Sequence, residues 1–109
     1  MHEVYFHNDG KDHDVGNFVI SLGDYQVDTL EDLMVVAQAG PEFMERCQDL
    51  GSGIWEYRRS LAPARYAILL FTFLQESNVY IVLHGFRAGR EGTTSSDLRH
   101  AKQVAKAYR

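Results

Sequence analysis

Three apolar segments in the second half of the chain decide the fold: IWEYRRS at residues 54–60, ARYAILLFTFL at 64–74 and VYIVLHGF at 79–86. Each segment is short, rich in aliphatic and aromatic residues, and bounded by turn-prone residues such as those of SLAPA and QESN. This pattern predicts three consecutive strands in an antiparallel meander. The middle segment is apolar on both faces, so we expect it to be the central strand.

The flanking segments predict one further strand and several helices. Alternation of side chains over residues 2–7 predicts a short N-terminal strand. Apolar residues at helical spacing predict helices over residues 14–22, 25–39 and 95–108, and a further helical turn within 41–50. The inward face expected for the second of these helices consists of Val27, Leu30, Leu33, Met34 and Ala37. In the third strand, alternation predicts that Tyr80, Val82, His84 and Phe86 share one face.

The run NDGKDHD at residues 8–14 predicts a turn that also caps the helix after it. Asp9, Asp12, His13 and Asp14 are close in sequence, but their spacing does not fit a calcium loop and the distal glutamate of such a loop is missing. We therefore expect no metal site and no cofactor.

Composition and length indicate a single domain over residues 1–109, with 45% hydrophobic and 24% charged residues. The longest apolar run is far shorter than the roughly 20 residues of a membrane span, so no membrane partner is expected. The single cysteine, Cys47, cannot form an internal disulfide, which favours a cytoplasmic protein. Its surroundings contain no nucleophile motif, and we interpret it as a half-buried structural thiol within a helical segment.

Charge is distributed unevenly along the chain. Residues 1–53 carry a net charge of −9, whereas residues 54–109 carry +5, giving the overall value of −4. Such asymmetry is typical of a protein with one face suited to a polyanion and another that is solvated or meets a basic partner. It argues against a protein that coats nucleic acid without specificity.

The motifs IWEYR, ARYAILLF and LHGF, followed by a polar loop and an amphipathic helix, resemble the phage-derived HigB-like branch of the RelE/ParE toxin superfamily, from about Gly53 to Tyr108. The resemblance implies an α+β domain with a RelE-like fold. Its antiparallel sheet would combine the three-strand meander with the N-terminal strand, packed by two N-terminal helices and a C-terminal helix. It also implies a cytoplasmic toxin of a type II toxin-antitoxin system, which cleaves mRNA on the ribosome and is held inactive by a helix-turn-helix antitoxin.

The resemblance further implies a site for RNA cleavage, in which the ribose 2′-hydroxyl attacks the neighbouring phosphate and fixed cations stabilise the developing charge. The residues implied to be catalytic are Arg65, Tyr66 and His84, and those implied to bind RNA are Arg58, Arg87 and Arg90. The chain departs from the family pattern at Ala67, where an arginine is common, and at Leu70, where a tyrosine is common. Arg65 is the candidate to replace the missing arginine, because it shares a strand face with Ala67.

Other interpretations stay open at this point. Arg58 and Arg65 can form surface pairs with Glu56 or Glu91, Tyr66 can be core, and His84 can be a hydrogen-bonded interior residue. A second hypothesis is a catalytically degenerate binding protein, whose acidic N-terminal half imitates a polyanion for a host nucleic-acid-binding protein. A third, from the ParE side of the superfamily, is a toxin directed at DNA gyrase.

Overall fold

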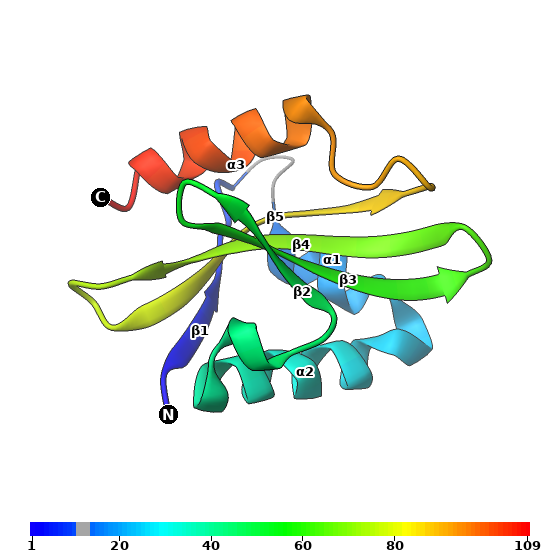
Figure 1. The fold of residues 1–109 in the computed structure, drawn as a ribbon, viewed down its shortest axis with the longest axis horizontal. Coiled ribbons are helices and arrows are strands. Elements are labelled where there is room, and N and C mark those ends of the chain that lie inside the picture. The colour runs from blue at the N-terminus through cyan, green and yellow to red at the C-terminus, as the bar shows by residue number, and fades with distance from the viewer. Residues whose placement is uncertain (11–13) are drawn as a thin grey trace.

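The computed structural model describes residues 1–10 and 14–109, and this part of the chain is α+β, with one five-stranded mixed sheet and three α-helices (Figure 1). In chain order the elements are β1 (Glu3–Phe6), α1 (Val15–Ile20), the 3-10 turn η1 (Gly23–Tyr25), α2 (Gln26–Ala39), the 3-10 turn η2 (Pro41–Phe43), β2 (Cys47–Gly51), β3 (Ile54–Ala62), β4 (Arg65–Leu74), β5 (Val79–Ala88) and α3 (Ser95–Lys106).

The strands lie in the order β1-β5-β4-β3-β2, which confirms the meander of β3, β4 and β5 with β4 at its centre. The expectation of an entirely antiparallel, four-stranded sheet was wrong in two respects. β1 pairs parallel to β5, and α1 and α2 then lead the chain from this edge of the sheet to β2 at the opposite edge. β2 is an additional strand, antiparallel to β3, formed where the sequence predicted a helical turn.

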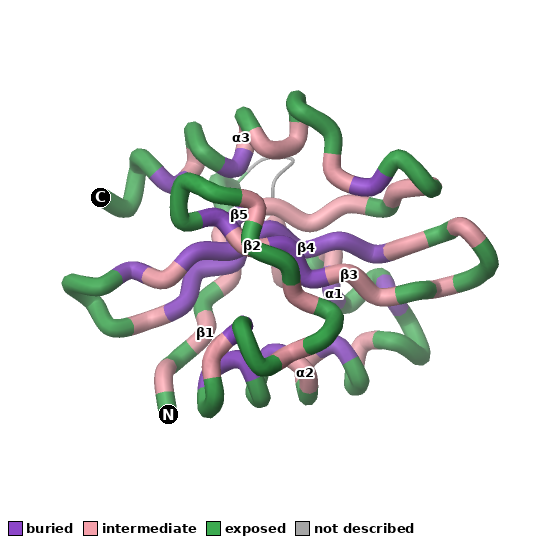
Figure 2. The backbone as a smooth tube through the Cα atoms, in the orientation of Figure 1, coloured by how far each residue is buried: buried purple, intermediate pink, exposed green. Residues whose placement is uncertain are grey.

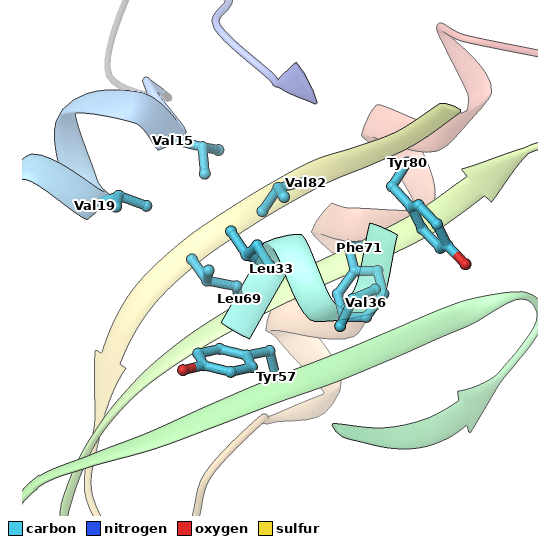
Figure 3. Packing of buried hydrophobic residues seen from close by; sticks show 9 residues of the cluster. All are labelled: Val15, Val19, Leu33, Val36, Tyr57, Leu69, Phe71, Tyr80 and Val82. Atoms are coloured by element: carbon cyan, nitrogen blue, oxygen red, sulfur yellow. The ribbon is translucent and has the colours of Figure 1, made fainter. Parts of the chain in front are cut away.

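Helices cover both faces of the sheet (Figure 1). α1 and α2 pack on one face of the sheet, which we call the α2 face. α3 packs on the opposite face, which we call the α3 face. Figure 3 shows the cluster of the α2 face, made of Val15, Val19, Leu33, Val36, Tyr57, Leu69, Phe71, Tyr80 and Val82. The cluster of the α3 face is made of Ile54, Ile68, Leu70, Leu74, Ile81, Leu83, Ala101 and Ala105. β4 is buried along most of its length, whereas the outer sides of α2 and α3 are exposed (Figure 2).

A β-bulge in β5 changes which side chains share a face. Leu70 of β4 pairs with His84, but the next residue, Phe71, pairs with Val82, so Leu83 is the extra residue. Leu83 and His84 therefore both lie on the α3 face, opposite Val82. The prediction that His84 and Phe86 share a face with Tyr80 and Val82 was wrong, because strict alternation does not hold across the bulge.

α2 matches its predicted span but is rotated about its axis relative to the prediction. Its buried residues are Thr29, Leu33, Val36 and Ala37. Val27 and Met34 are instead 63% and 54% exposed. Thr29 is accommodated in the interior because its hydroxyl donates to the Tyr25 carbonyl at 2.7 Å. This local hydrogen bond satisfies a polar group in the core, which the apolar spacing alone does not reveal.

The helix ends agree with the sequence signals. Asp14 caps α1 by accepting from the Asn17 backbone N–H at 3.0 Å. Asn8 accepts from the Gly10 N–H at 2.8 Å, as expected for a turn, while residues 11–13 of the predicted turn lie outside the described residues. Thr94 caps α3 with a complete capping box. The capping box thereby defines the start of α3, beside which the candidate functional site lies.

Candidate functional site

A buried carboxylate on the α3 face fixes an arginine. Glu56 of β3 is only 3% exposed, and its two oxygens accept from Nε and Nη2 of Arg58, each at 3.2 Å. The Thr93 hydroxyl donates to the same carboxylate at 2.5 Å. A buried charge is stable only when it is paired and hydrogen-bonded, so these contacts explain why Glu56 is tolerated there. The two-bond geometry also fixes the plane of the guanidinium.

Arg58 is held from two further sides. Its Cζ lies 5.2 Å from the centre of the Tyr66 ring, which is within the range of a cation–π contact. Its Nη2 lies against Gly92, where an added Cβ would come within 2.1 Å. The Arg58 side chain remains 33% exposed, so the guanidinium is fixed and still reaches solvent.

A second chain of contacts leads from the start of α3 to His84. Asp97 accepts from the Thr94 backbone N–H at 3.1 Å and from its hydroxyl at 2.8 Å, and Asp97 Oδ1 lies 3.2 Å from His84 Nε2. Partial burial acts to raise the pKa of Asp97, but the hydrogen bonds from Thr94 and His84 outweigh it, and the pKa lies below its usual value. The carboxylate is therefore ionised and accepts a hydrogen bond from the Nε2–H group of His84.

We name the group of Glu56, Arg58, Tyr66, His84, Thr93, Thr94 and Asp97 the Arg58–His84 site. The cross-strand register explains its layout, because Glu56, Leu70 and His84 form one row across β3, β4 and β5, and Arg58, Ile68 and Phe86 form the next. His84 also stacks on Phe86 with ring centres 4.8 Å apart. Arg58 and His84 therefore belong to adjacent rows, separated by two strand spacings of about 5 Å each.

A hollow of about 300 Å³ lies beside Arg58 at the start of α3. Its lining residues are Gln48, Leu50, Glu56, Arg58, Thr93, Thr94, Ser95 and Leu98. Backbone N–H groups of a first helical turn and an arginine both favour an anion. The hollow therefore suits binding of a phosphate group beside Arg58, whereas His84 and Asp97 are not among its lining residues.

The other predicted residues lie apart from this site. Alternation along β4 places Arg65 on the α2 face, opposite Tyr66, although both line a second hollow of about 470 Å³ together with Arg87. Arg87 donates to the Ser21 carbonyl at 3.0 Å and its Cζ lies 5.6 Å from the Phe18 ring centre. Arg90 is exposed in the loop between β5 and α3. Arg58, Tyr66 and His84 thus lie on the same face of the sheet without sharing one hollow, whereas Tyr66 lines the second hollow with Arg65 and Arg87.

Ala67 is only 1% exposed and pairs with Arg59 and Arg87 on the α2 face. Arg59 is engaged by α2: its Nη2 lies 2.6 Å from Asp32 Oδ2, and its Nε donates to the Tyr57 hydroxyl at 2.9 Å. These contacts join β3 to α2. The position of Ala67 is therefore part of the core beside a structural ion pair and does not open onto the Arg58–His84 site.

Sequence reasoning missed three parts of the site: the burial of Glu56, the hydroxyl of Thr93 and the carboxylate of Asp97. The pattern Thr94-x-x-Asp97 is a capping box and offered a signal for Asp97. No signal in the sequence predicts the contact between Asp97 and His84, because this contact depends on the bulge that turns His84 towards α3.

Cys47 begins strand β2 and is not in a helix, contrary to the prediction. The thiol is partly buried, and burial together with Asp32 and Glu56 raises its pKa to about 12. A protonated thiol is a poor nucleophile, which agrees with a structural role.

Within residues 1–10 and 14–109, no three His, Cys, Asp or Glu side chains gather in a way that could hold a metal ion. None of the described helices combines the length and apolar character needed to cross a membrane. Comparison of the chain with protein-family profiles, with curated proteins and with solved structures finds no match.

Proposed function

We propose that this chain is a toxin of a type II toxin-antitoxin system that acts in the cytoplasm as a ribosome-dependent mRNA endoribonuclease, and that a helix-turn-helix antitoxin inhibits it. One observation carries the proposal: Arg58 is fixed by Glu56, Tyr66 and Gly92 beside a hollow at the start of α3, and His84 lies on the same face. The motifs shared with HigB-like toxins supply the reaction class.

In the proposed reaction the ribose 2′-oxygen attacks the adjacent phosphorus, and the bond from phosphorus to the 5′-oxygen breaks. The products are a 2′,3′-cyclic phosphate and a 5′-hydroxyl. Arg58 stabilises the charge on the phosphate oxygens. His84 transfers protons between the 2′-hydroxyl and the leaving 5′-oxygen, and Asp97 stabilises its protonated form. Tyr66 stacks on Arg58 and offers a surface for a base.

The test is a cell-free translation reaction in which cuts in the message are mapped by primer extension. The variants are Arg58→Lys, which keeps the charge but loses the two-pronged contact with Glu56, and His84→Gln, which removes the titratable ring. We expect each to reduce cleavage about 100-fold. Arg99→Ala changes an exposed cation of α3 outside the site and should cleave like the wild type. Intact messages at high concentrations of folded wild-type protein would refute the ribonuclease.

A second candidate function is favoured by the way several arginines are engaged within the protein. Arg58 binds Glu56, Arg59 binds Asp32, and Arg87 binds Ser21, while Ala67 supplies no cation. These contacts suit a non-catalytic protein that binds a host nucleic-acid-binding protein through its acidic first half. Such a protein would leave messages intact and would compete with DNA or RNA for that partner.

A further inference from the structure

An apolar groove lies between β1 and α2, on the side of the molecule away from α3. It has a volume of about 530 Å³ and is lined by Met1, His2, Glu3, Val4, Tyr5, Phe6, Leu30, Leu33, Met34 and Ala37. Met34 is 54% exposed, and Val27 extends this apolar surface by a further turn of α2 at 63% exposed, while Tyr5, 51% exposed, lies on the other face of β1. Large side chains of this kind gathered on one surface mark an interaction site more often than scattered ones do.

The groove runs along the edge of the sheet. β1 is the last strand on its side, and in a parallel pair alternate residues direct their backbone groups to the partner strand. The His7 N–H donates to Val82 of β5 at 2.9 Å, so Val4 and Phe6 direct their N–H and C=O groups away from β5. α2 meets this edge at His2, whose N–H donates to the Ala37 carbonyl at 2.9 Å. The backbone of Val4 and Phe6 therefore presents the hydrogen-bonding pattern of an open strand edge.

The two edges of the sheet differ in how they resist further pairing. β2, at the other edge, has a register shift between Asp49 and Gly51, and such a bulge interrupts the pairing pattern. β1 is regularly paired over Glu3–Phe6 and contains neither proline nor lysine. Among the described residues, β1 is therefore the edge that accepts an added strand more readily.

The charged side chains beside the groove indicate which side chains a strand added to β1 would carry. Among the residues that the structure describes, Glu3 is the one aspartate, glutamate, lysine or arginine that lines the groove, and its side chain shares a face of β1 with Tyr5, opposite Val4 and Phe6. Glu31 is exposed on α2 one turn from Val27 and Met34, so it borders the same apolar surface. A second copy of this chain would bring another acidic β1 to this edge, whereas a segment with lysine or arginine complements it.

We propose that this groove binds an extended, basic segment of a partner protein, which pairs with Val4 and Phe6 as an added strand. Apolar side chains on one face of the segment contact Leu30 and Met34, and lysine or arginine side chains on its other face reach Glu3. Strand addition of this kind derives affinity from main-chain hydrogen bonds and selectivity from alternate side chains. The proposal does not rest on the ribonuclease function, because no residue of the Arg58–His84 site lines the groove.

The test uses a display library of random twelve-residue peptides, selected on the wild-type protein and counter-selected on Val4→Pro. Proline at this position removes an outward N–H but no bond to β5, so the fold should persist. We expect enriched peptides to alternate apolar residues with lysine or arginine. In fluorescence anisotropy, a labelled peptide from this pool should bind Val4→Pro and Met34→Asp at least tenfold more weakly than the wild type. Glu3→Lys should weaken binding and reduce its salt dependence.

Val35→Asp is the matched control, since Val35 is 43% exposed on the same helix but does not line the groove. It should bind within twofold of the wild type, as should Arg58→Lys. Thermal unfolding checks each variant, and Met34→Asp and Glu3→Lys decide the question if Val4→Pro does not fold. The proposal is overturned if no binder emerges, if binders lack basic residues, or if Val4→Pro and Met34→Asp bind normally. A wild-type dimer that Val4→Pro dissociates would assign the edge to a second copy and overturn it too.

Discussion

A Cβ atom placed on Gly92 would lie 2.1 Å from Nη2 of Arg58, so the Gly92 backbone and the guanidinium are in direct contact. Gly92 also has a φ of +62°, which side chains other than glycine rarely adopt. The loop between β5 and α3 can therefore approach Arg58 only through a residue without a side chain. This contact joins the loop to the ion pair between Arg58 and Glu56.

Gly92→Ala should displace the guanidinium and also strain the loop. We expect the free energy of unfolding to fall by about 1–2 kcal/mol from the left-handed backbone alone, with a further loss from the contact. Urea unfolding measures this change. Gly23→Ala is the control, because Gly23 has a similar φ of +61° with no atom within 4 Å of an added Cβ. Equal losses in the two variants would show that the contact with Arg58 contributes nothing.

The ion pair between Asp32 and Arg59 should matter more than its neighbour on the same helix. Asp32 is 16% exposed and lies 2.6 Å from Arg59, whereas Asp28 is 60% exposed and lies 4.0 Å away. Asp32→Asn should lower the free energy of unfolding by about 2 kcal/mol, and Asp28→Asn by less than about 0.5 kcal/mol. Urea unfolding of both variants gives the comparison, and a larger effect at Asp28 would contradict it.

Tyr57 should report on the same ion pair spectroscopically. Burial and the hydrogen bond to Asp32 raise the pKa of Tyr57 to about 12, from an ordinary 10.0. Because the folded state holds this proton more tightly, its contribution to stability is present below pH 10 and is lost as the pH rises towards 12. Absorbance of tyrosinate should show a component titrating near pH 12 that is lost in Tyr57→Phe. In Asp32→Asn its midpoint should move to lower pH.

Asp97 should stabilise the protein only when it is ionised. Its pKa is lower in the folded state, so its contribution is present above the unfolded-state value of about 3.8 and is lost as the pH falls through the folded-state value. Asp97→Asn should reduce the free energy of unfolding at pH 7 by about 1 kcal/mol, through the helix cap. Once the pH has fallen below the folded-state pKa of Asp97, the two proteins should converge. Glu31→Gln, an exposed acid on α2, provides the comparison for loss of one charge.

Cys47 should be unreactive in the folded protein. With a pKa of about 12, against 9.0 for an ordinary cysteine, its thiolate population is about a thousandfold lower at pH 8. Iodoacetamide should therefore alkylate the native protein far more slowly than the urea-unfolded protein, as followed by intact mass. Similar rates in the two states would contradict the protected thiol.

The sequence by itself determined the features encoded by local physical chemistry. β3, β4 and β5 follow from apolar segments separated by turn residues, and the ends of α1 and α3 follow from Asp14 and Thr94, whose side chains cap nearby N–H groups. The short alternating segment before Asn8 correctly predicted β1. Arg58, Tyr66 and His84, chosen by resemblance to HigB-like toxins, do share one face of the sheet.

Only the tertiary structure decided the features that depend on contacts distant in sequence. β2 contains Gln48, Asp49 and Gly51, which are poor strand formers, and it forms because β3 offers an edge for pairing. The parallel pairing of β1 joins residues 3–6 to residues 79–82, far away in the sequence. The bulge at Leu83 turns His84 towards Asp97, and α2 can bury Thr29 because its hydroxyl is satisfied within its own helix. Periodicity describes a single element, whereas register, bulges and strand order are set by the neighbours that each element meets.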